Sequence, residues 1–513
     1  MKKIISIISV CLTALYSCDN MLDLEPKTSW SVLNMPSELI HVENILNGGY
    51  ERIGSALLDG FVIYGDERAD VYYVNAANYA VHDRITRSQL DGNLSESNWY
   101  RFYQIIRQAN INIEYVPQLI ADYTITADEG NPILGQAYCQ RAFAYFWITR
   151  IWGEAPLRLE AVTNTGQDIA IRKSSVDDVF KCIHNDLDSA YKYIPAQTAA
   201  ARVTRTHFSP IAVKALKAHA YMWQKEYVKA IDELNDVVVS GYYTLSPLYD
   251  ATQTPANTSA FRSFIATTAY SKMFNSTTGG TGNESIFEVA FSSESRNINN
   301  TFDNFWANAT NPVFRAREEC MHLYTTDDFR YYAHIVPVGQ RYNCDKFVKN
   351  YARGDNRNLV LIRLADIYLL YAEAVIMLSN EDPTNEQRNA IMSYINKIRV
   401  RARGAGAAYL AGNGSDGGYL DRNVFPDKAE FLRLVKLERQ KELMFEGQRW
   451  FDLVRWDDAK EALANMRESE QYDFNFYNGP VYLSESGLDL VWPVYNEEIR
   501  RSNGRIEQNI YYR

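Results

Sequence analysis

Residues 210–239 carry the pattern that most narrows the fold of this chain. Apolar side chains recur there every three or four residues, first at Ala212, Leu216, Ala220 and Trp223. After the short polar turn "QKEY" they recur at Tyr227, Ala230, Ile231, Leu234 and Val238. This spacing places each apolar set on one face of a helix. We therefore predict two consecutive helices. One pair cannot bury both apolar stripes alone, so several pairs must stack.

The helix pair resembles a tetratricopeptide unit, with small Ala residues at the contact, an aromatic residue before the turn and an Ala three residues after Tyr227. Residues 364–374 and 386–403 predict a second pair, and residues 99–152 and 176–193 predict two weaker units. The expected fold class is mainly α, a tetratricopeptide-like helix-pair superhelical scaffold with long irregular loops and minor β structure.

Two long stretches interrupt the helical pattern. Residues 251–285 are rich in Thr, Ser, Asn and Gly, and residues 404–418 read "GAGAAYLAGNGSDGG". Loops of such length in a compact domain are usually functional or disordered, and ligand sites tend to lie on loops held by a rigid frame. We therefore expect both stretches to be irregular and to offer ligand contacts. Minor strands are expected at residues 285–291 and 479–482.

The first residues predict export and a lipid anchor. Lys2 and Lys3 precede the apolar run "IISIISVCLTAL", which is too short to span a bilayer comfortably. The following "LYSC" resembles the cleavage motif of bacterial lipoproteins, although Tyr16 departs from its small residues, and a plain secretory signal stays open. We predict a signal peptide at 1–17, lipidation at Cys18, a tether at 18–30 and one domain at 31–513, divided near residue 240 into an N-terminal part and a loop-rich C-terminal part.

Charge and cysteine content exclude several classes of site. The net charge of −10 opposes a nucleic-acid footprint, which needs a basic face. Outside the leader and Cys18, the cysteines show no metal-ligand spacing, so no metal site or cofactor is predicted. A calcium ion in the acidic loop 416–421 stays open. A disulfide also stays open among four cysteines, Cys139, Cys182, Cys320 and Cys344.

No motif of a known catalytic class occurs in the chain. HExxH, GxSxG, the P-loop and the dinucleotide-binding glycine pattern are all missing from the sequence. A glycosidase needs two placed carboxylates, but 63 acidic residues make any candidate pair uninformative. We therefore predict a protein that is not an enzyme.

The most conspicuous motif is "ERQKELMFEGQRWFDLVRW", residues 438–456. Read as one helix, it places Glu442, Glu446 and Arg449 along one face, where opposite charges pair. Trp450 and its large apolar neighbours would be buried beside them, with Asp452 one turn away. Structural ion-pair networks mimic active sites. We interpret the motif as a brace between helices.

This motif closely resembles the signature of the SusD/RagB family of outer-membrane lipoproteins. Collinear segments are similar to the same family, namely "LDLEPKTS", "IIRQANINI", "RAFAYFWITRIWGEAPL", "IRLADIYLLYAEA" and "VWPVYNEEIRRSNGRIEQN". The resemblance implies a SusD-like helical fold and a lipid-anchored position at the cell surface, in the outer membrane. It also implies a SusC-like TonB-dependent transporter as partner, over which the lipoprotein acts as a lid that delivers oligosaccharides or peptides.

The resemblance places a ligand site in the segment before residue 99 and in loops of the middle third. Aromatic faces there can pack on sugar rings while polar groups fix orientation, and each aromatic residue can equally fill a loop core. The candidates are Asp66, Asp70, Tyr72, Tyr73, Asn75, Tyr79, Arg84, Tyr270, Phe302 and Trp306.

We therefore expect a surface-exposed lipoprotein that binds a glycan without altering it. Two alternatives stay open at this stage. One is a peptide-binding, RagB-like member of the same family, and the other is a surface hydrolase.

Overall fold

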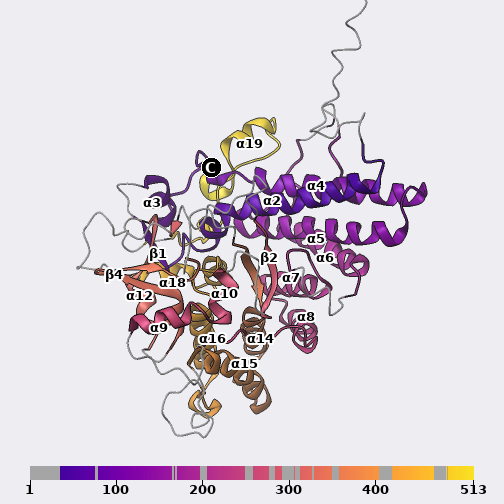
Figure 1. Cartoon of the computed structure of the whole chain (residues 1–513). Helices are drawn as coiled ribbons and strands as arrows, with labels where there is room; N and C mark the ends of the chain where they lie inside the picture. The colour runs from indigo at the N-terminus through magenta and orange to yellow at the C-terminus, as the bar shows by residue number, and fades with distance from the viewer. Residues whose placement is uncertain are drawn as a thin grey trace, which may run out of the picture.

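The computed structural model describes residues 35–74, 79–163, 167, 170–196, 205–248, 258–275, 283–291, 305–306, 312–325, 328–348, 357–379, 381–403, 419–466, 481 and 483–513. Helices dominate these residues, and two small sheets lie among them (Figure 1). None of the helices in these ranges combines the length and apolarity needed to cross a membrane. The mainly α prediction is confirmed, while the signal peptide, Cys18 and the tether lie outside the described residues.

Four long helices form the N-terminal half of the scaffold and lie side by side (Figure 1). Thr126 and Glu129 form a reciprocal capping box that starts one of them, and Gly153, with φ of 79°, ends it. Ser175 caps the next helix by accepting from the N–H of Asp178. The four are α2 (Leu39–Gly65), α4 (Tyr100–Ala121), α5 (Ala127–Trp152) and α6 (Val176–Tyr193).

The predicted helix pairs follow: the first lies within the predicted residues 210–239, and in the second the first helix extends to Leu378, four residues beyond the predicted end, and the next helix begins at Asn385. Ser209 caps the first helix and Pro210 occupies its first position, where a missing N–H costs nothing. The second helix of this pair packs against the first helix of the next, so pairs distant in sequence stack as predicted. Ala230 and Ala374, both fully buried, permit close approach. These helices are α7 (Pro210–Trp223), α8 (Tyr227–Val239), α14 (Leu364–Leu378), α15 (Asn385–Arg403) and α16 (Lys428–Glu442).

Two antiparallel sheets carry the minor β structure. The larger has the order β1-β3-β5-β4, from β1 (Tyr72–Val74), β3 (Phe314–Ala316), β5 (Arg341–Cys344) and β4 (Ile335–Val338). The smaller pairs β2 (Ser285–Val289) with β6 (Leu359–Arg363). The strand expected at 285–291 is thus present. Of the other, residues 479–480 and 482 lie outside the described residues, and Val481 is not in a strand.

Short helices connect these elements. They are α3 (Ala80–Thr86), α9 (Thr258–Ile265), α10 (Ala269–Asn275), α12 (Glu318–His322), α13 (Arg330–His334), α17 (Arg449–Arg455), α18 (Ala459–Ala464) and α19 (Asn496–Arg501). Short 3-10 turns lie at Ser95–Ser97, Arg422–Val424, Leu488–Leu490 and Ile510–Tyr512.

The expectation of irregular structure throughout residues 251–285 was wrong. Helices α9 and α10 lie within this stretch, and the helices bury Ile265, Tyr270, Met273 and Phe274 in the core. These apolar side chains recur at helical spacing, but the surrounding Thr, Ser and Asn residues hide the pattern. Residues 404–418 lie outside the described part of the chain.

The reading of residues 438–456 as one helix was also wrong. Helix α16 ends at Glu442, and α17 begins only at Arg449. Phe445 and Gly447 in the intervening turn have φ of 69° and 67°. A Cβ on Gly447 would lie 2.7 Å from the Phe61 carbonyl oxygen, so the close approach of α2 and the left-handed backbone both require glycine there.

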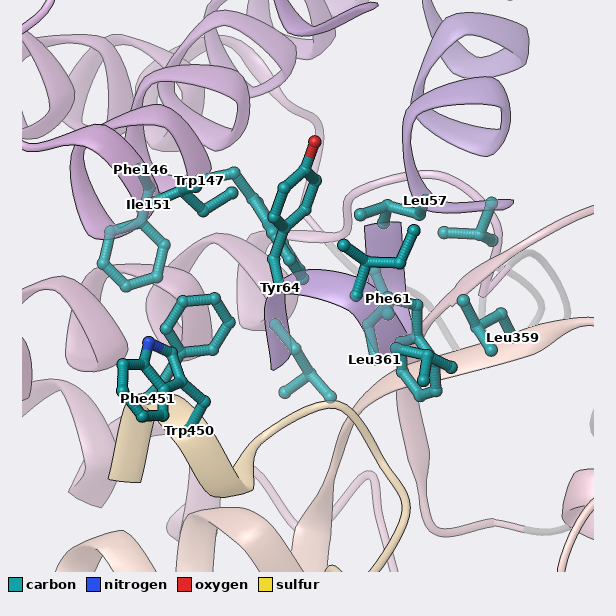
Figure 2. Packing of buried hydrophobic residues seen from close by; sticks show 14 of the residues in the cluster. Leu57, Phe61, Tyr64, Phe146, Trp147, Ile151, Leu359, Leu361, Trp450 and Phe451 are labelled. Atoms are coloured by element: carbon teal, nitrogen blue, oxygen red, sulfur yellow. The ribbon is translucent and has the colours of Figure 1, made fainter. Parts of the chain in front are cut away.

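Segments from four distant parts of the sequence meet in the main core, and Figure 2 shows their side chains gathered together. Trp147 and Phe451 pack edge to face with ring centroids 5.5 Å apart. The Arg68 guanidinium lies 4.1 Å from the centroid of Trp450, a side chain only 2% exposed. The motif's aromatic residues are therefore core residues. The labelled set comprises Leu57, Phe61, Tyr64, Phe146, Trp147, Ile151, Leu359, Leu361, Trp450 and Phe451.

A buried network of ion pairs lies around the end of α16. The Glu442 carboxylate accepts from the guanidinium groups of Arg330 at 3.1 Å, Arg363 at 2.7 Å and Arg401. Burial alone would raise the pKa of Glu442, but these arginines hold that pKa well below its ordinary value. Glu446 pairs with Arg363 at 2.6 Å. The network joins β6, α13, α15 and α16, as a brace would.

A second buried network links α14, α16 and α17. Arg439 donates to Asp366 and to Asp452, each at 2.7 Å. Arg455 pairs with Asp452 at 2.9 Å and with Glu373 at 2.7 Å. Removing one member of such a set leaves a buried charge without its partner, so these pairs fix one relative placement of the three helices.

Candidate functional site

Asp66 and Asp70, two predicted ligand contacts, anchor the segment before β1. The fully buried Asp66 carboxylate accepts from the backbone N–H groups of Gly447 at 2.8 Å and Arg449 at 3.1 Å. Burial raises the pKa of Asp66 to about 7, although these two hydrogen bonds lower it. The Arg449 guanidinium donates twice to Asp70, each time at 2.8 Å, and outweighs burial to lower the pKa of Asp70. Both carboxylates are engaged with the motif; Asp66 is fully buried, whereas Asp70 is partly exposed and lines a cavity.

Three of the predicted aromatic contacts lie in the core. Tyr72 and Tyr270 are fully buried, and Trp306 is 2% exposed. The Tyr270 hydroxyl lies 2.7 Å from Nε2 of His334, and Trp306 stacks on Phe347 with centroids 5.2 Å apart. An aromatic face inside the core offers no surface to a sugar, so the structure corrects these three assignments to packing residues.

The remaining candidates divide between the surface and the undescribed part of the chain. Tyr79 is half-buried and packs against the main core just before α3. Arg84 lies in α3 with its side chain 40% exposed, and it pairs with Asp91 at 2.7 Å. Asn75 and Phe302 lie outside the described residues. Tyr79 and Arg84 therefore keep access to a ligand.

One side of the larger sheet collects polar side chains. Tyr73 on β1 pairs in register with Arg315 on β3, so the two side chains share one face. Arg315 donates from Nη1 to the amide oxygen of Asn343 on β5 at 2.8 Å, which places Asn343 on that face as well. Arg341 lies two residues before Asn343 on the same strand. We call Tyr73, Arg315, Arg341 and Asn343 the polar face.

The opposite side of the same sheet is apolar. Tyr72, Phe314 and Cys344 point into the core with Trp306, and Tyr72 and Phe314 pack with centroids 5.1 Å apart. The alternation of side chains along each strand therefore separates Tyr72 from Tyr73, although the two are adjacent in sequence.

Three arginines and one carboxylate act on Tyr73 at the polar face. Burial raises the pKa of Tyr73, while Arg315, Arg341 and Arg317 lower it. Burial lowers the pKa of Arg315, and repulsion from the neighbouring Arg341 lowers it further. Glu318, at the start of α12, is a carboxylate near Tyr73. Arg341 is partly exposed and gives the polar face its contact with solvent.

Partly exposed tyrosines lie beside the edge of the sheet. Tyr331 and Tyr332 on α13 have ring centroids 5.0 Å apart at 72°, and the Arg262 guanidinium lies 5.3 Å from each centroid. Tyr342 on β5 is partly exposed, and the neighbouring Tyr331 contributes to raising its pKa after burial. Tyr331, Tyr332 and Tyr342 form what we call the tyrosine patch. Such half-exposed rings can stack on the apolar face of a sugar.

A cavity of about 560 Å³ lies between α12 and helices α16 to α18. The Asp70–Arg449 pair forms part of its wall, beside aliphatic side chains such as Leu432 and Leu453. Its described lining includes no aromatic ring, and it therefore lacks a stacking surface for sugars. The partly exposed rings of the tyrosine patch fit glycan chemistry better than this cavity does.

Cysteine and metal chemistry are simple in the described residues. The four described cysteines, Cys139, Cys182, Cys320 and Cys344, are free thiols, and burial raises the pKa of each. The described part of the chain contains no group of three His, Cys, Asp or Glu side chains that could hold a metal ion. Of the acidic loop 416–421, residues 416–418 lie outside it, and Asp421 accepts from the N–H of Asn423.

Sequence reasoning missed Arg315, Arg341 and the tyrosine patch. The signals were weak, because the alternation in β3 spans only three residues and Tyr331 and Tyr332 follow a charged, loop-like stretch. Tyr73 was the one polar-face residue selected. The register of β1 against β3, which sequence does not give, decides which side chains it meets.

The fold and sequence both match known proteins. Residues 242–512 match the family model described as "SusD family", and residues 21–222 match one described as "Starch-binding associating with outer membrane". SusD-like protein P38 of Formosa agariphila is 26% identical, over 99% of this chain and 98% of its own length. SusD-like protein P2 of the same organism is 24% identical, over 82% of this chain and 81% of its own length.

Solved structures agree with this assignment. A SusD homolog from Bacteroides thetaiotaomicron superposes with a TM-score of 0.72 at 20% identity, covering 93% of this chain and 97% of that one. This likeness shows the fold, and the SusD model covers more than half of the chain. The resemblance drawn from the motifs is confirmed: the chain belongs to the SusD family.

Proposed function

We propose that this protein captures glycans at the outer face of the outer membrane and delivers them to a SusC-like TonB-dependent transporter. Membership of the SusD family supports glycan binding, and the description of the model matched by residues 21–222 supports an outer-membrane position. The lipoprotein-like sequence at Cys18 supports a lipid anchor that holds the domain at the cell surface.

The tyrosine patch is the observation that carries glycan capture. Its three rings are only partly buried and lie near guanidinium and carboxylate groups, including Arg262, Asp345 and Glu318. Stacking surfaces combined with charged hydrogen-bonding groups are the usual means of gripping a sugar. The tightly paired charges around Glu442 are fully buried and offer a substrate no access. We therefore propose binding without chemistry.

Affinity electrophoresis against a panel of neutral and acidic polysaccharides tests this proposal. At least one polymer should retard the wild-type protein, and Tyr331→Ala combined with Tyr342→Ala should weaken that retardation. Tyr191→Ala is the matched control, since Tyr191 is 49% exposed on α6, away from the sheet. Retardation by none of the polymers would refute glycan capture, and product release during long incubation with a bound polymer would refute the absence of catalysis.

The partnership is tested separately. Solubilised outer membranes from the native organism should yield a TonB-dependent transporter together with this protein after affinity purification. Purification of the protein alone under gentle detergent conditions would count against the lid arrangement.

A further inference from the structure

A second cavity, of about 410 Å³, lies between α2, β2 and the short segment that leads into α7. Helix α2 and strand β2 contact each other (Figure 1). The volume falls within the range of about 300–1,000 Å³ that small-molecule sites occupy. This cavity shares no lining residue with the first cavity or with the tyrosine patch, so it is a separate place on the molecule.

Hydrogen bonds and ring stacking hold the walls of this cavity in place. The N–H of Phe208 donates to the Tyr50 hydroxyl at 3.1 Å. The N–H of Glu288 donates to the Arg205 carbonyl at 2.9 Å. Phe208 also stacks on Phe287 of β2, with ring centroids 4.1 Å apart. These contacts tie the chain before α7 to α2 on one side and to β2 on the other, so the walls are positioned before any ligand arrives.

Part of the lining is apolar or aromatic. Val289 of β2 and Phe291, two residues after it, are nearly buried and form the floor. Tyr50 and His207 are both partly exposed, and their ring centroids lie 4.4 Å apart at 54°. A lining of this kind suits the apolar C–H face of a sugar ring.

Four polar side chains line the same cavity. Asn44 and Asn47 are exposed on α2 and lie three residues apart, on one face of the helix. Thr206 and His207 come from the segment before α7. Within the described residues, none of these four side chains forms a hydrogen bond. An amide, a hydroxyl and a neutral imidazole each offer both a donor and an acceptor, as a sugar hydroxyl does.

The charges around the cavity favour an uncharged ligand. The described lining includes Glu51 and Glu288 and contains neither lysine nor arginine. Arg205 pairs with Glu288 at 4.0 Å but does not line the cavity. A carboxylate or sulfate would therefore meet like charge here. Burial lowers the pKa of His207, so its imidazole is neutral at pH 7 and keeps one ring nitrogen as an acceptor.

We propose that this cavity is a second glycan site, which takes one neutral sugar unit. The sugar ring lies against Val289, Phe291 and Tyr50, and its hydroxyls exchange hydrogen bonds with Asn47 and His207. The inference rests on the proposed glycan capture for the class of ligand, and it adds a site apart from the tyrosine patch.

NMR of the histidine rings detects a ligand at this cavity directly. The probes are the methyl glycosides of glucose, galactose, mannose and xylose, with the methyl galacturonoside as the acidic counterpart of the galactoside. The His207 signals are those that disappear in His207→Phe. We expect at least one neutral glycoside to shift these signals saturably, and the galacturonoside to shift them less. If no neutral glycoside shifts them, or if the galacturonoside shifts them most, the inference is overturned.

Two variants locate the contacts, and isothermal titration calorimetry measures their affinity for the glycoside that responds. Asn47→Ala and His207→Phe should each weaken binding about twofold to tenfold, the scale of one lost hydrogen bond. His207→Phe keeps a ring beside Tyr50, so its loss reports the ring nitrogens and not the packing. Asn185→Ala, at an exposed position on α6, is the matched control and should change nothing. Unchanged affinity in both cavity variants would overturn the assignment.

The outcomes separate this inference from the proposed function. If a polysaccharide retards the wild type while no methyl glycoside shifts the His207 signals, glycan capture stands and the second site is overturned. If a methyl glycoside binds at His207 while no polysaccharide retards the wild type, the second site stands and capture of polymers fails. Tyr331→Ala combined with Tyr342→Ala should leave the His207 response unchanged, and loss of that response would overturn the separation of the two sites.

Discussion

Neutralising Glu442 by Glu442→Gln should strongly destabilise the fold. The carboxylate is fully buried and accepts from Arg330, Arg363 and Arg401. The amide keeps the shape of the side chain but removes the one negative charge that all three guanidinium groups share. Each arginine keeps another carboxylate, Asp328 or Glu438 for Arg330 and Glu284 for Arg363 and Arg401, but the buried network loses one negative charge. Breaking a buried ion pair on one side costs about 3–5 kcal/mol. We expect a loss of that size in the free energy of unfolding.

Urea denaturation followed by far-ultraviolet circular dichroism measures this loss. The matched control is Glu430→Gln in the same helix, α16, where Glu430 pairs with Arg433 and their side chains are 40% and 64% exposed. That exposed pair should contribute no more than about 0.5 kcal/mol. If Glu442→Gln costs less than about 1 kcal/mol, or no more than Glu430→Gln, the network is not a brace and the electrostatic reasoning fails.

The pH dependence of the same comparison gives a second check. The folded-state pKa of Glu442 lies well below 4.5, its ordinary value, so its contribution to stability is fully present above pH 4.5. The contribution is lost as pH falls toward the folded-state pKa, because the unfolded chain binds the proton first. The difference in stability between wild type and Glu442→Gln should therefore be constant from pH 6 to 8 and shrink below about pH 4.5. A difference that grows in acid would contradict this sign.

Three further changes probe packing, close backbone approach and anchoring. Trp450→Ala should cost about 3–5 kcal/mol in urea titrations, because it empties a buried site beneath the Arg68 guanidinium; a loss under 1 kcal/mol would place this ring outside the core. Gly65→Ala should lower the free energy of unfolding by about 1–3 kcal/mol or more, since the new Cβ would lie 2.1 Å from the Gly447 carbonyl oxygen. Gly48→Ala, in the same helix, has no neighbour nearer than 3.9 Å and should raise the free energy of unfolding by about 0.5–1 kcal/mol. Cys18→Ala should release the protein from the membrane fraction after cell lysis, and unchanged membrane association would refute lipid anchoring at this residue.

Helical periodicity predicted the scaffold well because each helix buries a stripe along its whole length. The pattern at residues 210–239 correctly predicted where a helix pair begins and where it divides. Ser209 and Pro210 start the first helix, and a polar turn separates it from the second. The same reasoning failed at residues 438–456. There the charges continue at helical spacing across Phe445 and Gly447, while the backbone turns. Side-chain spacing alone does not reveal a residue with left-handed backbone inside an otherwise helical pattern.

The site could be predicted far less well, because short strands leave almost no periodic signal. Tyr72 and Tyr73 carry the same side chain in the same segment and are both buried, yet Tyr72 packs in the main apolar core and Tyr73 lies on the polar face. Only the pairing of β1 with β3 decides between them, and β3 lies more than two hundred residues away along the chain. Composition likewise hid the polar face, since the net charge of −10 gives no hint of clustered arginines.

The family motif and the candidate site are connected by the two aspartates that sequence reasoning assigned to the ligand. Asp66 accepts from the backbone after Phe445, and Asp70 pairs with Arg449, so the turn between α16 and α17 holds both ends of the short segment that leads into β1. That strand carries Tyr73 and sets the register of Arg315. The ion pairs of Glu442 and Arg439 in turn fix α16, and hence the turn, against the helix pairs. A buried, charged motif thus determines where the strand that carries Tyr73 lies, which explains how a structural motif can resemble an active site in sequence.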